Sequence, residues 1–149
     1  IFEKSIVFET DEFGRKIIDK NLKINDQEQK AKVLGEANET SLINALENFN
    51  LKDCFFLIDI EGDEFKLLNK YNLNKLKKSV LIIELHDFYF SPKKLISKLK
   101  KIFKTKILTT ENRDLSNYKV VENLHDTEKW LLVNEGRPQK MQWIVCTPR

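Results

Sequence analysis

Two short acidic segments, each directly after a run of apolar residues, hold the side chains best suited to chemistry. The first is Asp59-Ile60-Glu61, after the run 55–58, and the second is Glu84-Leu85-His86, after the run 80–83. Residues two positions apart in a strand lie on the same face, so each segment presents a polar pair on one side. If the two runs are neighbouring parallel strands, three carboxylates and an imidazole meet at one edge of the sheet. Carboxylates that close need compensation, so we expect them to change protonation, bind a cation or hold a polar substrate.

The candidate catalytic residues are therefore Asp59, Glu61, Glu84 and His86. His86 or Asp59 could accept the proton of a substrate hydroxyl and so create an oxygen nucleophile. A purely structural interpretation stays open, because Glu61 and Asp63 also suit a helix N-terminus, and Glu84 and His86 could bond loop backbone groups. Carboxylates with one histidine also suit Mg²⁺ or Mn²⁺, but from the sequence we assign no metal ligand.

Helical periodicity follows most of the predicted strands, which places the acidic segments at strand ends. Thr10 is expected to cap the first helix, and Ser91-Pro92 to start a later one. Strands alternating with helices predict an α/β fold with a mostly parallel sheet, helices on both faces and an antiparallel C-terminal edge strand. The predicted strands are 5–8, 31–34, 55–58, 80–87, 106–110 and 141–147, and the predicted helices are 11–22, 40–49, 65–76, 92–103 and 126–133.

Ligands of open parallel sheets bind beyond the carboxyl ends of the strands, so a second acidic residue, Glu9, also matters. It ends the strand 5–8. A solvated residue at a strand end would explain Glu9 equally well.

Length and composition restrict the class of protein. The chain has 149 residues, of which 41% are hydrophobic and 33% charged, which fits one well-packed domain. The net charge is only +3, and the lysines are spread over many predicted helix faces. This distribution does not favour a nucleic-acid partner. No apolar run is long enough to span a membrane and no secretory signal is present, so a cytoplasmic protein is expected. Cys54 and Cys146 lie beside apolar runs and are expected to be reduced core residues.

The order of several motifs resembles the FkbM-like branch of class I S-adenosylmethionine-dependent methyltransferases. The matching pieces are Ile6-Val7-Phe8-Glu9-Thr10-Asp11, then Leu57-Ile58-Asp59-Ile60-Glu61-Gly62-Asp63-Glu64, then Ile82-Ile83-Glu84-Leu85-His86-Asp87-Phe88, and a tail with Arg137-Pro138 and Met141-Gln142-Trp143. The resemblance implies a Rossmann-like sheet of seven strands, in which 6–9, 32–35, 55–59 and 80–86 are the second to fifth. It also implies S-adenosylmethionine as cofactor and methyl transfer to the hydroxyl of a small acceptor.

The resemblance also implies how the site residues divide. Glu9 would accept hydrogen bonds from the ribose hydroxyls of the cofactor, since a carboxylate can accept from two hydroxyls at once. Glu36, Ala37 and Asn38 would lie near the adenine. Asp59 and Glu61 would face the methionine end of the cofactor and the acceptor.

One departure from the family pattern is the absence of its glycine-rich cofactor turn. None of the four glycines forms a G-x-G pattern, although backbone N–H groups in such a turn normally let the cofactor approach. Residues 1–149 therefore resemble a single truncated methyltransferase domain that lacks the first β-α unit. The second strand of the family would then pair directly with the fourth, or with another chain, forming a homodimer through an exposed sheet edge. The alternative function is a non-catalytic Rossmann-like module for binding or self-association, and we expect S-adenosylmethionine to bind this chain weakly or not detectably.

Overall fold

The computed structural model describes residues 2–86, 92–110, 114–115, 118–133 and 141–149. The predicted strand end at Asp87, the predicted cap Ser91 and the Arg137-Pro138 motif lie outside these residues. Within them, strands and helices alternate along the chain as predicted. The strands are β1 Ser5–Phe8, β2 Ala31–Leu34, β3 Phe55–Ile58, β4 Val80–Leu85, β5 Lys104–Thr109 and β6 Gln142–Thr147, and the helices are α1 Glu12–Ile24, α2 Glu39–Leu46, α3 Glu64–Leu67, α4 Lys70–Leu76, α5 Lys93–Ile102 and α6 Asp126–Val133.

The strands form two sheets. β1 and β2 pair in parallel, and a four-stranded sheet has the order β3-β4-β6-β5. β3 and β4 are parallel, whereas β6 runs antiparallel to both of its neighbours. The prediction of an antiparallel C-terminal strand is confirmed, but its place at the edge is wrong, because β5 occupies the edge. The burial explains this order: Ile144 and Cys146 of β6 are fully buried, whereas most of β5 is exposed.

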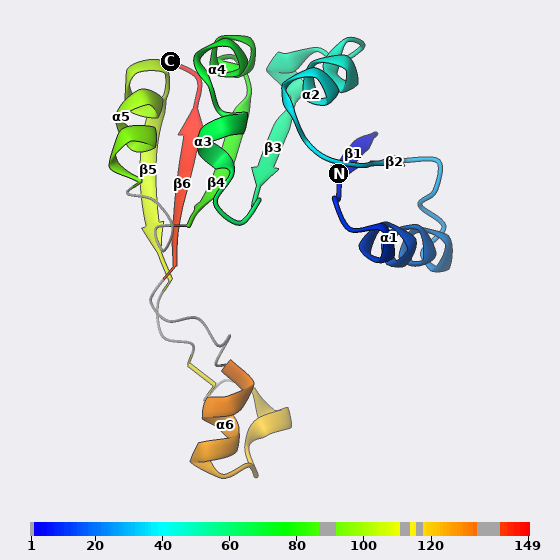
Figure 1. Ribbon diagram of the computed structural model, residues 1–149. Helices are drawn as coiled ribbons and strands as arrows, with labels where there is room; N and C mark the ends of the chain where they lie inside the picture. The colour runs from blue at the N-terminus through cyan, green and yellow to red at the C-terminus, as the bar shows by residue number, and fades with distance from the viewer. Residues whose placement is uncertain (1, 87–91, 111–113, 116–117, 134–140) are drawn as a thin grey trace.

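Within the described residues, β1 and β3 each have one edge that pairs with no other strand. β1 pairs only with β2 and β3 only with β4 among the described residues, so the expected direct pairing of 6–9 with 55–59 is not formed. Figure 1 shows the β1–β2 pair beyond β3, separated from it. Leu57 of β3 is 64% exposed, and Phe55 of β3 stacks on Phe2 with ring centroids 6.1 Å apart.

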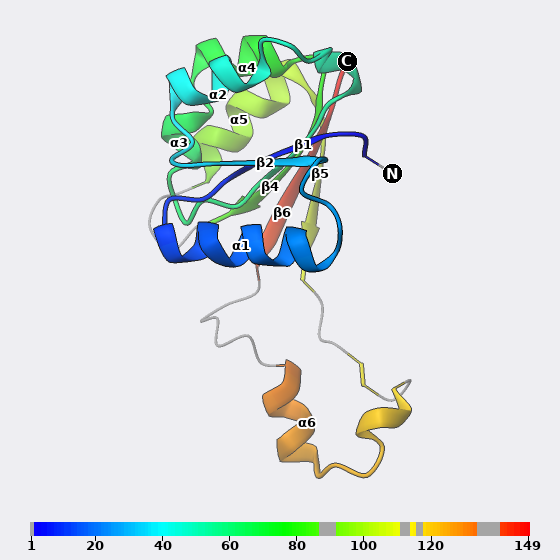
Figure 2. The same ribbon diagram turned by 90° about the vertical axis from the view of Figure 1, so that its right-hand side faces the viewer.

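Most of the core lies between the four-stranded sheet and helices α3 to α5. These helices lie on one side of that sheet, and α1 and α2 flank the β1–β2 pair on opposite sides (Figure 2). The prediction of helices on both faces therefore holds for the smaller sheet, whereas α3 to α5 share one face of the larger one. The fully buried core residues include Leu68, Leu73, Leu76, Leu81, Ile83, Leu95, Leu99, Phe103 and Ile144.

Two helix boundaries differ from the predictions for local reasons. Asp11 rather than Thr10 caps α1, because its side chain accepts the Gly14 N–H at 2.6 Å. The single helix predicted over 65–76 is broken into α3 and α4, since the Asn69 side chain accepts the Asn72 N–H at 2.9 Å and starts a new helix. Leu68, at the break, is fully buried and anchors the bend in the core.

The segment around α6 stands away from the sheets (Figure 1). Trp130, Leu131 and Leu132 of α6 remain largely exposed. Among the described residues, none of the helices has the length and apolar character needed to cross a membrane.

Candidate active site

The segment after β3 turns sharply and brings its carboxylates back over the end of the strand. Asp59 directly follows β3, and Glu61 and Gly62 then take left-handed backbone conformations with φ of 52° and 106°. A residue with a side chain rarely adopts a positive φ, so the conformation of Glu61 is strained, whereas Gly62 tolerates it. Helix α3 begins two residues later, at Glu64.

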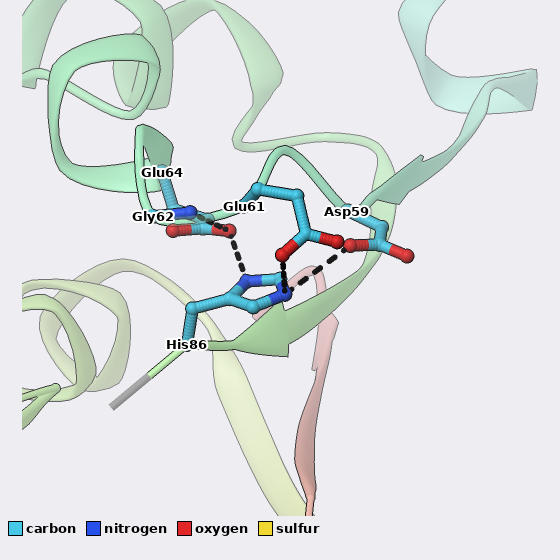
Figure 3. Close-up of polar contacts among 5 residues, drawn as sticks. All are labelled: Asp59, Glu61, Gly62, Glu64 and His86. Atoms are coloured by element: carbon cyan, nitrogen blue, oxygen red, sulfur yellow. Dashed lines mark hydrogen bonds and ion pairs between the residues drawn. The ribbon is translucent and has the colours of Figure 1, made fainter. Parts of the chain in front are cut away.

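The segment after β4 places an imidazole against this turn. β3 and β4 are parallel neighbours, with Ile58 opposite Ile83, so the residues that follow them meet at the same edge of the sheet. His86 follows β4 and is 3% exposed. Figure 3 shows its ring between Glu64 on one side and Glu61 and Asp59 on the other.

Three carboxylates contact the His86 ring. Nδ1 lies 2.7 Å from Oε1 of Glu64, and Nε2 lies 3.4 Å from Oδ1 of Asp59 and 3.3 Å from Oε2 of Glu61. The fourth acidic residue, Glu84, is 1% exposed, and one oxygen of its carboxylate lies within 4.8 Å of ligand atoms of both Asp59 and His86. The structure therefore brings all four candidate catalytic residues together.

Glu64 belongs to this group, although the sequence reasoning assigned it no role. Its side chain is 2% exposed, and Oε1 also accepts the Gly62 N–H at 3.3 Å. A carboxylate only accepts, so Nδ1 of His86 must carry the proton of the shared hydrogen bond. Glu64 thus orients the ring through Nδ1 and turns Nε2 toward Asp59 and Glu61. The only sequence signal was its position just after the predicted turn at Gly62.

Glu9 lies at the other sheet, and its carboxylate is directed at the start of α1. Oε1 accepts the Asp11 N–H at 2.8 Å, and a Cβ added to Gly14 would lie 3.0 Å from the Glu9 side chain. The Arg15 guanidinium donates to the carbonyls of Glu9 and Thr10 at 2.8 and 2.7 Å. The small residue at position 14 therefore makes room for the Glu9 carboxylate.

The predicted adenine-side residues follow β2, beside Glu9. The Glu9 N–H donates to the Leu34 carbonyl at 3.1 Å, which places the residues after β2 next to Glu9. Glu36 is exposed and Ala37 is half-buried. The Asn38 side chain caps α2: it accepts the Ser41 N–H at 2.9 Å, and the Ser41 hydroxyl accepts the Asn38 N–H at 2.9 Å. Asn38 thus has a structural role that its sequence position did not reveal.

Other polar features lie outside this group. A hydrogen bond to Asp63, together with its charge, raises the pKa of Lys66 at the surface. Both cysteines are free; Cys146 is buried as predicted, and Cys54 is half-buried. A hollow of about 390 Å³ is lined by residues of the 114–133 segment and by none of the His86 group.

Comparison with known proteins supports the fold. No protein-family model and no curated sequence matches the chain. Several solved structures do match. Among them are the METTL16 MTase domain (crystal form 2), with a TM-score of 0.56 and 15% identity, and a human methyltransferase 10 domain containing protein, with a TM-score of 0.57 and 15% identity. Each of these two matches covers 96% of this chain, but only 49% and 60% of the two other chains respectively. At this identity the likeness shows the fold alone: an α/β fold that resembles the Rossmann-like domain of these methyltransferase structures.

Proposed function

We propose that this chain is part of an S-adenosylmethionine-dependent methyltransferase that methylates a hydroxyl oxygen of a small acceptor. The observation that carries the proposal is the position of Asp59, Glu61, Glu84 and His86 at the ends of neighbouring parallel strands in a methyltransferase-type fold. The FkbM-like order of motifs in the sequence supports the finer assignment. FkbM-like relatives act on different acceptors, so we commit only to a hydroxyl group.

The cofactor would bind beyond the carboxyl ends of β1, β2 and β3. Glu9 would accept from the ribose hydroxyls, after exchanging its present hydrogen bond with the Asp11 N–H. Glu36 and Ala37 would flank the adenine, and Asn38 would contribute backbone only, because its side chain caps α2. Asp59 would lie at the methionine end.

In the proposed reaction His86 or Asp59 removes the proton of the acceptor hydroxyl. S-adenosylmethionine would supply the methyl group: the oxygen would attack the methyl carbon in line, the C–S bond would break as the O–C bond forms, and S-adenosylhomocysteine would leave with the electron pair of the broken bond. Positioning of the two reactants supplies much of the rate in such a transfer. Glu64 acts as a positioning residue, because it contacts His86 and orients its ring.

Calorimetric titration with S-adenosylmethionine tests the cofactor assignment. We expect weak or undetectable binding by residues 1–149, because this sequence carries no G-x-G turn. Micromolar affinity would contradict the role that we give to that turn. If the natural gene encodes a strand and a Gly-x-Gly turn before Ile1, a chain extended by those residues should bind the cofactor.

The same extended chain tests the site residues. Glu9→Ala should weaken binding by at least about tenfold, since hydrogen bonds to a charged group are worth about 1.5 to 3 kcal/mol. Glu12→Ala, at an exposed residue paired with Lys16, is the control and should change binding little. Equal affinities of the two variants would remove Glu9 from the cofactor site.

A non-catalytic self-association module remains the second candidate, supported by the unpaired edges of β1 and β3. Exposed strand edges pair readily with other chains. Sedimentation velocity should then show a homodimer that dissociates when Leu57, exposed on β3, is changed to Lys. A monomer at all concentrations would exclude this function for residues 1–149.

A further inference from the structure

The imidazole of His86 presents a buried nitrogen to carboxylate oxygens without bonding to them. The side chain is 1% exposed, and Nε2 forms no hydrogen bond, although oxygens of Asp59 and Glu61 lie 3.4 and 3.3 Å away (Figure 3). Because Nδ1 is bonded to Glu64, Nε2 is the ring nitrogen left to bind a further group. A buried nitrogen that faces carboxylate oxygens without a hydrogen bond is unfavourable unless a cation lies between them.

The distances from Nε2 to the two oxygens leave room for a metal ion. Charge-assisted N–H···O⁻ hydrogen bonds are about 2.7 to 2.9 Å long, shorter than both contacts of Nε2. Two ligand atoms on one tetrahedral Zn²⁺, each about 2.0 to 2.1 Å from the ion, are roughly 3.3 to 3.4 Å apart. The observed spacing of 3.3 and 3.4 Å matches the edge of such a tetrahedron.

We propose that Asp59, Glu84 and His86 bind a Zn²⁺ ion, with Glu61 available as a fourth ligand. The ligand atoms of the first three lie within 4.8 Å of one another, so small side-chain movements close them around one ion. Imidazole nitrogen and carboxylate oxygen are both common ligands of zinc. The buried Glu64 carboxylate on Nδ1 supplies the outer contact that orients metal-binding histidines.

Zinc bound here would occupy Nε2 of His86 and an oxygen of Asp59, so the ion and the proton removal proposed above are alternatives. The zinc site itself does not depend on methyl transfer. Binding of the metal alone tests it, so a failure of the proposed function would leave the zinc site intact. Conversely, a chain that binds no zinc could still transfer methyl groups through His86 or Asp59.

The experiment is equilibrium dialysis of residues 1–149 against Zn²⁺, with Co²⁺ absorption as a report of tetrahedral coordination. We expect one ion per chain and a visible Co²⁺ spectrum that Zn²⁺ abolishes. Asp59→Asn and His86→Gln should each weaken binding at least tenfold, and Glu64→Gln by about 10- to 100-fold, the usual effect of losing an outer contact.

The control is Asp63→Asn. Asp63 lies in the same turn, and its exposed carboxylate forms an ion pair with Lys66. The affinity of this variant for Zn²⁺ should be within twofold of that of the unchanged chain. Circular dichroism shows whether each variant folds, and Asp59→Asn, at a partly exposed side chain, decides the matter if His86→Gln does not fold. Absence of stoichiometric binding, or Asp59→Asn binding as tightly as Asp63→Asn, would overturn the proposal.

Discussion

The positive φ angles of Glu61 and Gly62 form the turn that brings the carboxylates close to His86. A Cβ at the Gly62 φ of 106° is strained, and backbone strain of this kind costs about 1 to 3 kcal/mol. Gly62→Ala should lower the free energy of unfolding by that amount, measured by urea denaturation. Gly35→Ala is the matched control, because a Cβ there meets nothing within 4 Å. If both variants unfold at the same urea concentration, the turn at Gly62 tolerates a side chain.

The reactivity of the Cys146 thiol shows whether β6 is buried as the structure has it. Burial raises the pKa of its thiol to about 12, so almost none of it is thiolate at pH 8. We expect Cys146 to resist thiol reagents in the folded chain and to react once urea unfolds it. Cys54, whose pKa burial and Asp53 also raise, is only half-buried and should react first. Mass spectrometry of the labelled peptides identifies the order, and early labelling of Cys146 would contradict the packing of β6.

The raised pKa of the Cys146 thiol predicts how the free energy of unfolding changes at alkaline pH. Well below pH 9 the thiol is protonated in both the folded and the unfolded chain, so it does not make the free energy of unfolding depend on pH. Between pH 9 and 12 the unfolded chain loses this proton while the folded chain keeps it, so stability falls as the pH rises. Urea midpoints of the unchanged chain should therefore fall more steeply above pH 9 than those of Cys146→Ala, and parallel curves would exclude this contribution.

At the scale of elements, the capping of α2 separates a structural from a cofactor role for Asn38. Asn38 and Ser41 form a reciprocal capping box, and loss of an N-cap side chain costs about 0.5 to 2 kcal/mol. Asn38→Ala should lose that much stability. Asn44→Ala, at an exposed position within α2, should lose none, since alanine favours helix. Thermal denaturation compares the two, and equal stability would mean that the box contributes nothing.

At the scale of the whole molecule, the two sheets differ in how deeply they are buried. α1, β1 and β2 contain no buried residue, whereas β4 and β6 contain Leu81, Ile83 and Ile144, all fully buried. Exchange of backbone amides follows local opening, so the β1–β2 amides should exchange at least roughly tenfold faster than those of β4. Equal protection measured by hydrogen exchange would show that the two sheets unfold as one unit.

Local sequence patterns determined the elements and the polar ends of their strands. Apolar runs such as 55–58 and 80–83 form strands because short, β-branched and aromatic segments suit a buried sheet. The two-residue spacing of Asp59 and Glu61, and of Glu84 and His86, likewise followed from the sequence alone. These features are predictable because each depends on residues that are close neighbours in the chain.

Only the tertiary structure decided which distant residues meet. β6 lies between β4 and β5 because its alternate residues fill the core, a fit that strand patterns do not encode. Glu64 bonds His86 across 22 residues of sequence, which requires the left-handed turn at Glu61 and Gly62 and the parallel register of β3 and β4. The sequence by itself thus determined which side chains end the strands. The fold decided that they surround one imidazole, because that arrangement depends on packing between segments far apart in the chain.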